Sequence, residues 1–281
     1  MKPLNIMRNF LKFINKSFAG TLDDTLILFF LLWSPWTQAG SFSVSPVRIS
    51  LSASAPISAI TVQNGGSETV VLQLEAMAWA QQAGQDVYTP SRDILATPPI
   101  ITIPAGGSQI LRVGLRRVPD PQRELTYRLY LQEVPPPPKP GFTGLQVALR
   151  FGLPVFVSPV KEDTASLAWR ISRARNGQHE VGLTNSGNAH VQVANFKLVR
   201  ADGSELGTQH VAGYVLPGQT VTWKAKDIKV PASGNKLRLI ARTDIGEINA
   251  GLITVDGIAA SSSSIPEVGT IDSGIADAEL K

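Results

Sequence analysis

Apolar and polar residues alternate in short runs along most of the chain, from about residue 41 to residue 257. A period of two is typical of β-strands that bury one face. Turn signals such as Asn64-Gly65-Gly66 separate the runs, and no convincing amphipathic helix pattern lies between them. The pattern therefore predicts an all-β fold.

The alternation is interrupted by a short polar link at residues 160–164 and then starts again. About seven short strands with turns precede the link, as in an immunoglobulin-like sandwich of about 100 residues, and a second set follows it. We expect two immunoglobulin-like β-sandwich domains, at residues 40–158 and 159–257. Residues 258–281 are small, polar and acidic, which predicts a disordered tail.

The first 39 residues show the order of a secretory signal peptide: a basic stretch, the apolar run 26–33, and small residues up to Ala39. The apolar run is shorter than the ~20 residues that a membrane span needs. We expect an exported protein, cut near Ala39 and without a membrane span afterwards. The long basic region and Asp23-Asp24 leave an uncleaved anchor, or a start at Met7, as alternatives.

The charge balance excludes some partners. The chain has 26 basic and 22 acidic residues, a net charge of +4, which falls to +2 without residues 1–39. A net charge this small does not indicate the basic surface that binding to a nucleic acid requires. There is no cysteine, which excludes disulfides, thiol catalysis and cysteine-ligated metals.

No catalytic or metal-binding constellation appears in the sequence. The three histidines, His179, His190 and His210, have no ligand spacing, and each is expected at the surface or paired with a neighbour. Nucleophile-elbow, zinc-protease and phosphate-loop motifs are all absent. We expect neither enzymatic activity nor a metal or cofactor.

Residues 144–154 are the most informative segment. Large apolar residues occupy every second position (Leu145, Val147, Leu149, Phe151), between the proline-rich stretch 135–140 and Pro154, which is expected to end the strand. The segment is either an ordinary core strand or a strand that fills a groove in another polypeptide.

Arg150 lies on the opposite face of this expected strand, and Arg48 lies in the first strand of the same domain. Each is either a solvated strand arginine or part of a cleft that binds a carboxylate. Two guanidinium groups can hold a chain terminus through charge-assisted hydrogen bonds.

Over roughly residues 41–257 the chain resembles the periplasmic pilus-assembly chaperones of the chaperone–usher pathway. The segments that carry the resemblance, in order, are 45–48, 98–99 with 103–109, 127–136, 149–155, 183–188 and 214–218. The resemblance implies two immunoglobulin-like domains in a boomerang arrangement. It also implies a periplasmic protein whose partners are pilus subunits and an outer-membrane usher.

The resemblance also assigns roles to individual residues. By position, Arg48 and Arg150 would bind the terminal carboxylate of the subunit in the cleft between the domains. Leu145, Val147 and Leu149 would insert into the subunit's groove by donor-strand complementation, and Phe142 would be a further apolar side chain that inserts there. An uncovered donor strand is an aggregation hazard, so a self-capping homodimer is expected without a subunit.

Several departures from the best-known members predict a divergent branch, such as an archaic type making thin fibres or a coat-like surface layer. Arg150 stands where lysine is usual, residues 134–143 are proline-rich, and the middle signature matches poorly at Pro121 and Leu125. The alternative function is an exported structural or carbohydrate-binding β-sandwich surface protein. It is disfavoured because the tryptophans lie scattered among alternating strands.

Overall fold

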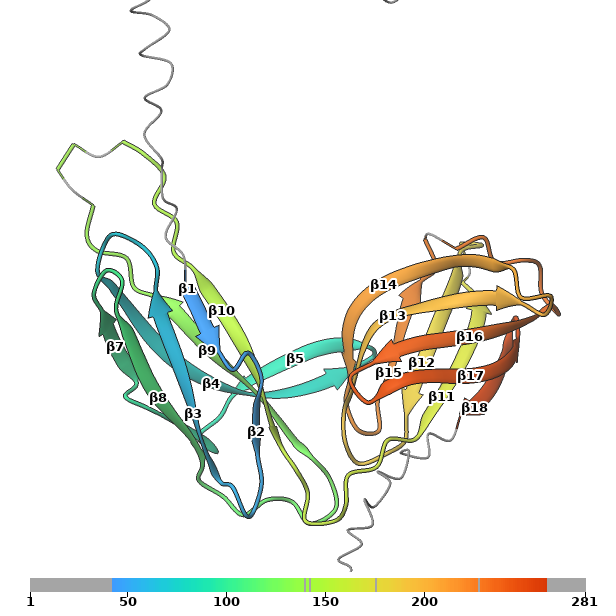
Figure 1. Cartoon of the computed structure of the whole chain (residues 1–281), viewed down its shortest axis with the longest axis horizontal. Coiled ribbons are helices and arrows are strands. Elements are labelled where there is room, and N and C mark those ends of the chain that lie inside the picture. Colours follow the sequence, from blue (N-terminus) through green and yellow to red (C-terminus); the bar gives the residue numbers. More distant parts are fainter. Residues whose placement is uncertain (1–41, 139, 142, 175, 227, 262–281) are drawn as a thin grey trace, which may run out of the picture. The chain divides into compact units, whose positions relative to one another are not determined.

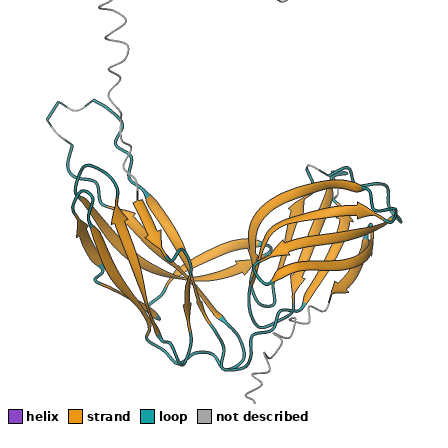
Figure 2. Cartoon of the chain, viewed as in Figure 1, coloured by secondary structure: helices purple, strands orange, loops and turns teal. Residues whose placement is uncertain are grey.

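The computed structural model describes residues 42–138, 140–141, 143–174, 176–226 and 228–261. The predicted signal peptide, Phe142 and residues 262–281 of the predicted tail lie outside the described residues. The described part consists of strands and loops and holds no helix (Figure 2), so no helix there could cross a membrane. The expected all-β fold class is confirmed.

The first ten strands form two sheets packed as a sandwich (Figure 1). They are β1 (Phe42–Ser45), β2 (Ile49–Leu51), β3 (Ile57–Asn64), β4 (Val70–Gln82), β5 (Gln85–Pro90), β6 (Ile94–Thr97), β7 (Ile100–Ile103), β8 (Ser108–Leu115), β9 (Leu125–Glu133) and β10 (Arg150–Val157). One sheet has the order β1-β3-β8-β6. The other has the order β2-β10-β9-β4-β5, with β7 also paired to β4.

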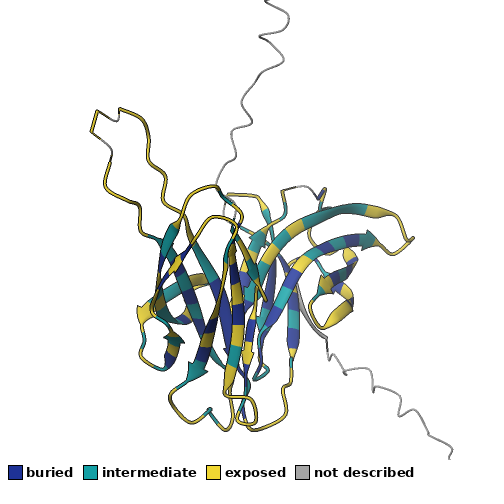
Figure 3. Ribbon diagram, turned by 60° about the vertical axis from the view of Figure 1, so that its left-hand side comes forward, coloured by how far each residue is buried: buried dark blue, intermediate teal, exposed yellow. Residues whose placement is uncertain are grey.

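The core of this sandwich follows from the alternation in its strands. Ile60 and Leu111 from one sheet, and Leu129 and Val155 from the other, are fully buried. Figure 3 shows that buried and exposed residues alternate along the strands. Side chains of even number on β9 and β10 therefore lie on the outer face of the sheet, and those of odd number lie in the core.

Eight further strands form the second sandwich, from two four-stranded sheets ordered β15-β12-β11-β18 and β14-β13-β16-β17. They are β11 (Leu167–Arg173), β12 (His179–Asn185), β13 (Val191–Arg200), β14 (Glu205–Val215), β15 (Thr220–Lys224), β16 (Lys236–Thr243), β17 (Gly246–Thr254) and β18 (Gly257–Ser261). Trp169 and Phe196 are both fully buried in its core, with ring centroids 6.3 Å apart. The sequence signal for two β-sandwiches is thus confirmed.

The strand expected at residues 144–154 differs from the prediction at both ends. β10 begins only at Arg150, because its neighbour β9 ends at Glu133 and the prolines 135–138 that follow have no N–H groups to continue the ladder. Pro154 lies inside β10 rather than at its end. The pairing of β10 with β2 starts one residue later, at Val155, so Pro154 interrupts no bond to β2.

The boundary predicted for the C-terminal tail, at residue 258, also lies earlier in the chain than the end of the last described strand. β18 pairs with β11 over five residues, from Leu167 opposite Ser261 to Ile171 opposite Gly257. A ladder of this kind pairs backbone N–H and C=O groups, which every residue except proline carries, so it can form without an alternating apolar pattern. The last described strand therefore extends to Ser261, beyond the boundary expected at residue 257.

Candidate functional site

The apolar residues that precede β10 are exposed. The fractional exposure of Leu145 is 87%, that of Val147 is 65% and that of Leu149 is 40%. They belong to the loop between β9 and β10 and not to any strand (Figure 1). They share their odd numbering with Phe151 and Leu153, which pack in the core of the first sandwich. The sequence pattern of the core face thus continues into a segment whose apolar side chains have no core to enter.

This exposed segment is held at its base. The Leu149 amide donates a hydrogen bond to Glu133 Oε2 (3.0 Å), and the Glu133 amide donates to the Leu149 carbonyl oxygen (2.8 Å). Further out, the Gln146 side-chain amide donates to the Pro136 carbonyl oxygen (2.9 Å). A side-chain carboxylate therefore takes the place of a strand partner at the point where regular pairing ends.

Arg150 lies on the outer face of the sheet, at the start of β10. Its guanidinium carbon is 4.1 Å from the ring centroid of Tyr130, and its Nη2 is 3.2 Å from Glu75 Oε2. Both side chains of this ion pair are about half exposed. Solvent screens such a pair, so a second carboxylate can compete with Glu75 at little cost.

Arg48 precedes β2 on the same outer face. Its Nη1 is 2.8 Å from Asp244 Oδ2, and Asp244 Oδ1 also accepts a hydrogen bond from the Gln192 amide (2.8 Å). Burial acts to raise the pKa of Asp244, but hydrogen bonds from His190, Gln192 and Arg48 together bring this pKa below its ordinary value. Asp244 is thus a carboxylate partner of Arg48 within the chain itself.

The two predicted cations do not lie at the same level of the sheet. Val155 pairs with Ile49 in parallel, so Arg48 is level with Pro154, four residues after Arg150 on β10. At about 3.3 Å per residue, the backbone positions of Arg48 and Arg150 are about 13 Å apart along the strand direction. Only long side chains that converge over Gly152 could share one small anion.

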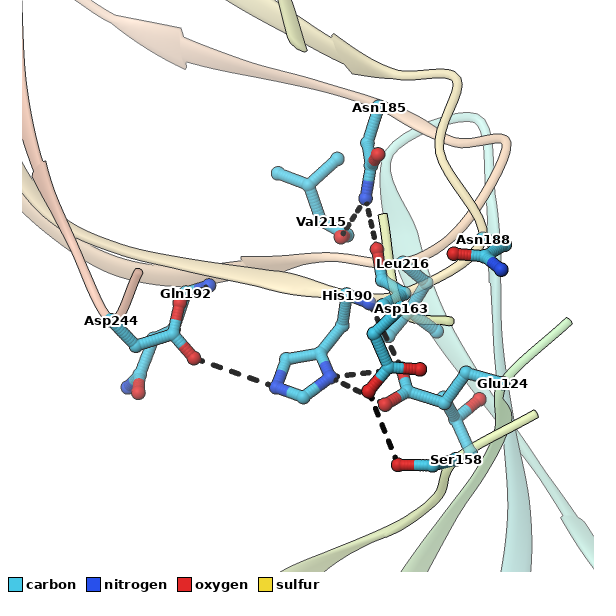
Figure 4. A network of polar contacts seen from close by, with 12 residues as sticks. Glu124, Ser158, Asp163, Asn185, Asn188, His190, Gln192, Val215, Leu216 and Asp244 are labelled. Atoms are coloured by element: carbon cyan, nitrogen blue, oxygen red, sulfur yellow. Dashed lines mark hydrogen bonds and ion pairs between the residues drawn. The ribbon is translucent and has the colours of Figure 1, made fainter. Parts of the chain in front are cut away.

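A charged network connects the two sandwiches, whose strands belong to one compact unit (Figure 4). Glu124 is buried, and its carboxylate accepts hydrogen bonds from the His190 amide (2.9 Å) and from His190 Nδ1 (2.8 Å). His190 Nε2 is 3.6 Å from Asp244 Oδ2. The imidazole therefore lies between two carboxylates from distant parts of the chain.

The protonation of His190 follows from these neighbours. Burial acts to lower its pKa, but the hydrogen bonds and negative charges of Asp244 and Glu124 outweigh burial and raise the pKa above its ordinary value. A pocket of about 310 Å³ adjoins the network, and its charged lining consists of Arg48, Glu124, Asp163, His190 and Asp244. His190 was expected to be a surface or paired residue, and it is paired.

An aromatic cluster lies beside this network. Trp79, Phe156 and Leu216 are buried together, with Tyr214 against them. Gln81 joins the same elements, because its side-chain amide donates to the Tyr214 carbonyl oxygen (2.9 Å) and its oxygen accepts from the Leu216 amide (3.0 Å). Trp79 is therefore a contact residue and not part of an exposed aromatic rim of the kind a lectin uses.

Arg128 is a residue of this face that the sequence analysis missed. It lies on β9 opposite Pro154, and its guanidinium carbon is 4.2 Å from the ring centroid of Trp79. The available signal was its position in the run 126–131, which carries bulky residues on both faces of the strand.

No cluster of His, Cys, Asp and Glu that could hold a metal ion occurs among the described residues.

Comparison with known protein families gives a match to the first sandwich. The family model described as pili and flagellar-assembly chaperone, PapD N-terminal domain, matches residues 41–162. No curated protein matches the chain.

Solved structures match across both sandwiches. A chain of the CsuC–CsuE chaperone–tip subunit pre-assembly complex, from archaic chaperone–usher Csu pili of Acinetobacter baumannii, is 22% identical with a TM-score of 0.56; the match covers 76% of this chain and 97% of that one. The E. coli chaperone DraB is 18% identical with a TM-score of 0.51, covering 77% and 96%. A chain of the Salmonella enterica SafA pilin–SafB chaperone complex is 18% identical with a TM-score of 0.52, covering 78% and 97%. At these identities the likeness shows the two-sandwich fold.

Proposed function

Because residues 41–162 belong to the PapD-type N-terminal domain family of pili and flagellar-assembly chaperones, we propose that this protein is a periplasmic chaperone for pilus subunits. It binds and caps subunits by donor-strand complementation and delivers them to an outer-membrane usher. The solved complexes with a tip subunit and with a pilin support subunits as the partner class.

One observation carries this proposal: three apolar side chains in an alternating segment are exposed immediately before β10. An extended segment can add itself as a strand to an incomplete sheet, where main-chain bonds give affinity and alternate side chains fill pockets. Leu145, Val147 and Leu149 are spaced for this, and each contributes about 1.5–3 kcal/mol when fully buried. Phe142 is proposed as a further apolar side chain that inserts into the subunit.

Arg48 and Arg150 are proposed to bind the terminal carboxylate of the subunit. Both lie on the outer face of the sheet that β10 belongs to, and both side chains are 40% or more exposed. Each already contacts a carboxylate within the chain, which indicates that the positions suit such a group. Binding then exchanges an internal carboxylate for that of the subunit.

The same exposed segment suggests a resting state. An uncovered apolar strand aggregates unless it is covered, so we propose that the chaperone caps itself as a homodimer when no subunit is present. Light scattering of the purified protein tests this. Addition of a subunit is expected to convert the dimer into a one-to-one complex, and a monomer at all concentrations contradicts the self-capped state.

The decisive experiment is co-expression with a tagged pilin-like exported subunit and recovery of the complex from the periplasm. The wild-type chain is expected to form a soluble one-to-one complex. Val147→Asp is expected to abolish the complex, because a charge cannot enter an apolar pocket unpaired. Val118→Asp is the matched control, since Val118 is also exposed (80%) but lies outside the segment. An intact complex with Val147→Asp contradicts donor-strand complementation.

A further inference from the structure

The sheet β14-β13-β16-β17 of the second sandwich (Figure 1) has a basic outer face. Exposed and buried residues alternate along β16, whose residues of even number face outward. Lys197 of β13 lies opposite Ile240 of β16 and so shares this face. The basic residues of the face are Lys197, Lys236, Arg238 and Arg242. The acidic residues of these four strands are Glu205 and Glu247, so positive charge is in excess.

The four cations of this basic face have no carboxylate partner among the ion pairs of the described residues. Glu247 lies opposite Arg242 on the neighbouring strand, yet no ion pair joins the two side chains. Glu205 accepts a hydrogen bond from the Thr208 hydroxyl (2.8 Å) instead. The ammonium and guanidinium donors of the basic face can therefore bind further carboxylates.

Aliphatic side chains lie between these cations. Arg238 pairs with Val199 on one side and with Leu252 on the other, and the fractional exposure of Leu252 is 51%. Ile240 is half-buried and lies between Lys197 and Asn249. A segment that carries both acidic and aliphatic side chains suits this face better than a small anion, because it can also cover the apolar surface.

The described part of the chain stops beside this face. β18 follows β17 and pairs with β11, with Ser261 opposite Leu167. β11 and β17 run parallel at the bridge between Ile171 and Val255, so Leu167 is level with Gly251 on β17. β17 is the edge strand of the basic sheet and also contacts β18. Residues 262–281 therefore start at the edge of the basic face, level with its exposed Leu252.

Residues 262–281, here called the C-terminal segment, have the complementary composition. The acidic residues of this segment are Glu267, Asp272, Asp277 and Glu279, against the single basic residue Lys281. The aliphatic residues Ile265, Val268, Ile271 and Ile275 are interspersed with the acids. A chain of this length can extend over about 66 Å, whereas a sheet of four strands is about 15 Å wide. The C-terminal segment is therefore long enough to cross the whole face.

We propose that the C-terminal segment docks onto the basic outer face of β13, β16 and β17. Its carboxylates pair with Lys197, Arg238 and Arg242, and its aliphatic side chains cover Leu252 and Ile240. The contact is sensitive to salt, because charges at an exposed surface are screened beyond about 10 Å at 0.1 M ionic strength. The docked segment shields this face from other acidic partners. This proposal goes beyond the chaperone function and does not depend on it.

The test measures the position of the C-terminal segment in the full chain. The sequence has no cysteine, so Ser273→Cys provides a single site for a nitroxide label. Paramagnetic broadening of the backbone amide signals is followed by NMR. The amides of Arg238, Ile240 and Leu252 are expected to lose about half of their intensity or more at about 0.02 M salt and to recover it at about 0.5 M, where screening is much stronger.

Two variants of the labelled protein separate charge pairing from mere proximity. The first replaces the four acids of the C-terminal segment by their amides (Glu267→Gln, Asp272→Asn, Asp277→Asn, Glu279→Gln) and leaves every described strand unchanged. The second combines Arg238→Gln with Arg242→Gln. Broadening on β16 and β17 is expected to disappear in both, because each removes one side of the charge pairing.

The matched control combines Arg112→Gln with Arg116→Gln, two exposed arginines of the first sandwich, and is expected to broaden as the wild type does. Broadening that persists in the variant with the neutral C-terminal segment overturns the proposal. Broadening of the wild type at another surface, or at no surface, also overturns it. If the Arg238→Gln, Arg242→Gln protein does not fold, the variant with the neutral C-terminal segment decides alone.

Discussion

The imidazole of His190 lies flat on the ring of Phe156, with ring centroids 3.5 Å apart and 9° between the planes. Phe156 belongs to β10 of the first sandwich, and His190 immediately precedes β13 of the second. The same imidazole contacts Glu124 and approaches Asp244. One side chain thus combines ring stacking with ionic contacts where the two sandwiches touch.

This arrangement predicts a pH-dependent stability. The pKa of His190 is raised in the folded chain, so its contribution is fully present below the unfolded pKa of about 6.5 and is lost as pH rises through the folded pKa. Urea unfolding between pH 5 and pH 9 is expected to show this decline, and His190→Gln is expected to flatten it. His210→Gln, at an exposed residue, serves as the control. An unchanged pH profile in His190→Gln contradicts the role of this imidazole.

Removal of Glu124 is expected to be costly. Glu124 is buried and pairs with both the amide and the ring of His190, so Glu124→Ala leaves a buried imidazole with one carboxylate fewer. We expect a loss of about 3 kcal/mol in the free energy of unfolding, as for a broken buried pair. Glu162→Ala, at an exposed position, is expected to change it by less than about 0.5 kcal/mol. Equal effects for the two variants would argue against a structural role for the network.

Arg48→Ala and Arg150→Ala separate binding from folding. Both arginines form partly exposed ion pairs, and each variant is expected to lose at most about 1 kcal/mol of stability. Recovery of the subunit complex by affinity purification is expected to fall to background in both. Wild-type recovery in both variants would contradict the proposed carboxylate site.

Gly152→Ala tests the space that Arg128 and Tyr130 occupy. The new methyl group would be 2.8 Å from a Tyr130 ring carbon and 3.1 Å from the Arg128 stem, so both must shift. We expect a loss of about 1–2 kcal/mol in the free energy of unfolding, measured by urea denaturation. At Gly114 the nearest atom would be 3.5 Å away, so Gly114→Ala is the control and is expected to cost less than Gly152→Ala; equal losses would contradict the crowding at Gly152.

Glu133 is expected to protect the base of the exposed segment. In Glu133→Ala the Leu149 amide loses its acceptor, and its hydrogen exchange is expected to accelerate by about tenfold, with little change in global stability. Glu133→Gln keeps an acceptor oxygen and is expected to exchange at nearly the wild-type rate. Amide exchange followed by NMR resolves the difference, and equal rates in all three proteins would exclude the contact in solution.

The sequence by itself determined the all-β class, the two sandwiches and the alternation of apolar residues before Pro154, whereas the exposure of Leu145 and Val147 came from the structure. The reason is that alternation between the two faces of a strand is a local property. A hydrophobic period of two residues indicates which side chains share a face, whatever the partner strand is. It could not show where pairing stops, because β10 begins only where β9 still offers backbone partners. For the same reason, the composition of residues 257–261 concealed a strand held by backbone bonds.

The partners across the fold were decided by tertiary structure alone. Arg48 and Asp244 are 196 positions apart, and Glu124 and His190 are 66 apart, with no periodicity that connects them. Arg128 appeared in the sequence as one bulky residue of a strand, and only the register against Pro154 places it near Arg48. Periodicity specifies a face, whereas the neighbours on that face depend on strand order and on which sandwich packs beside it.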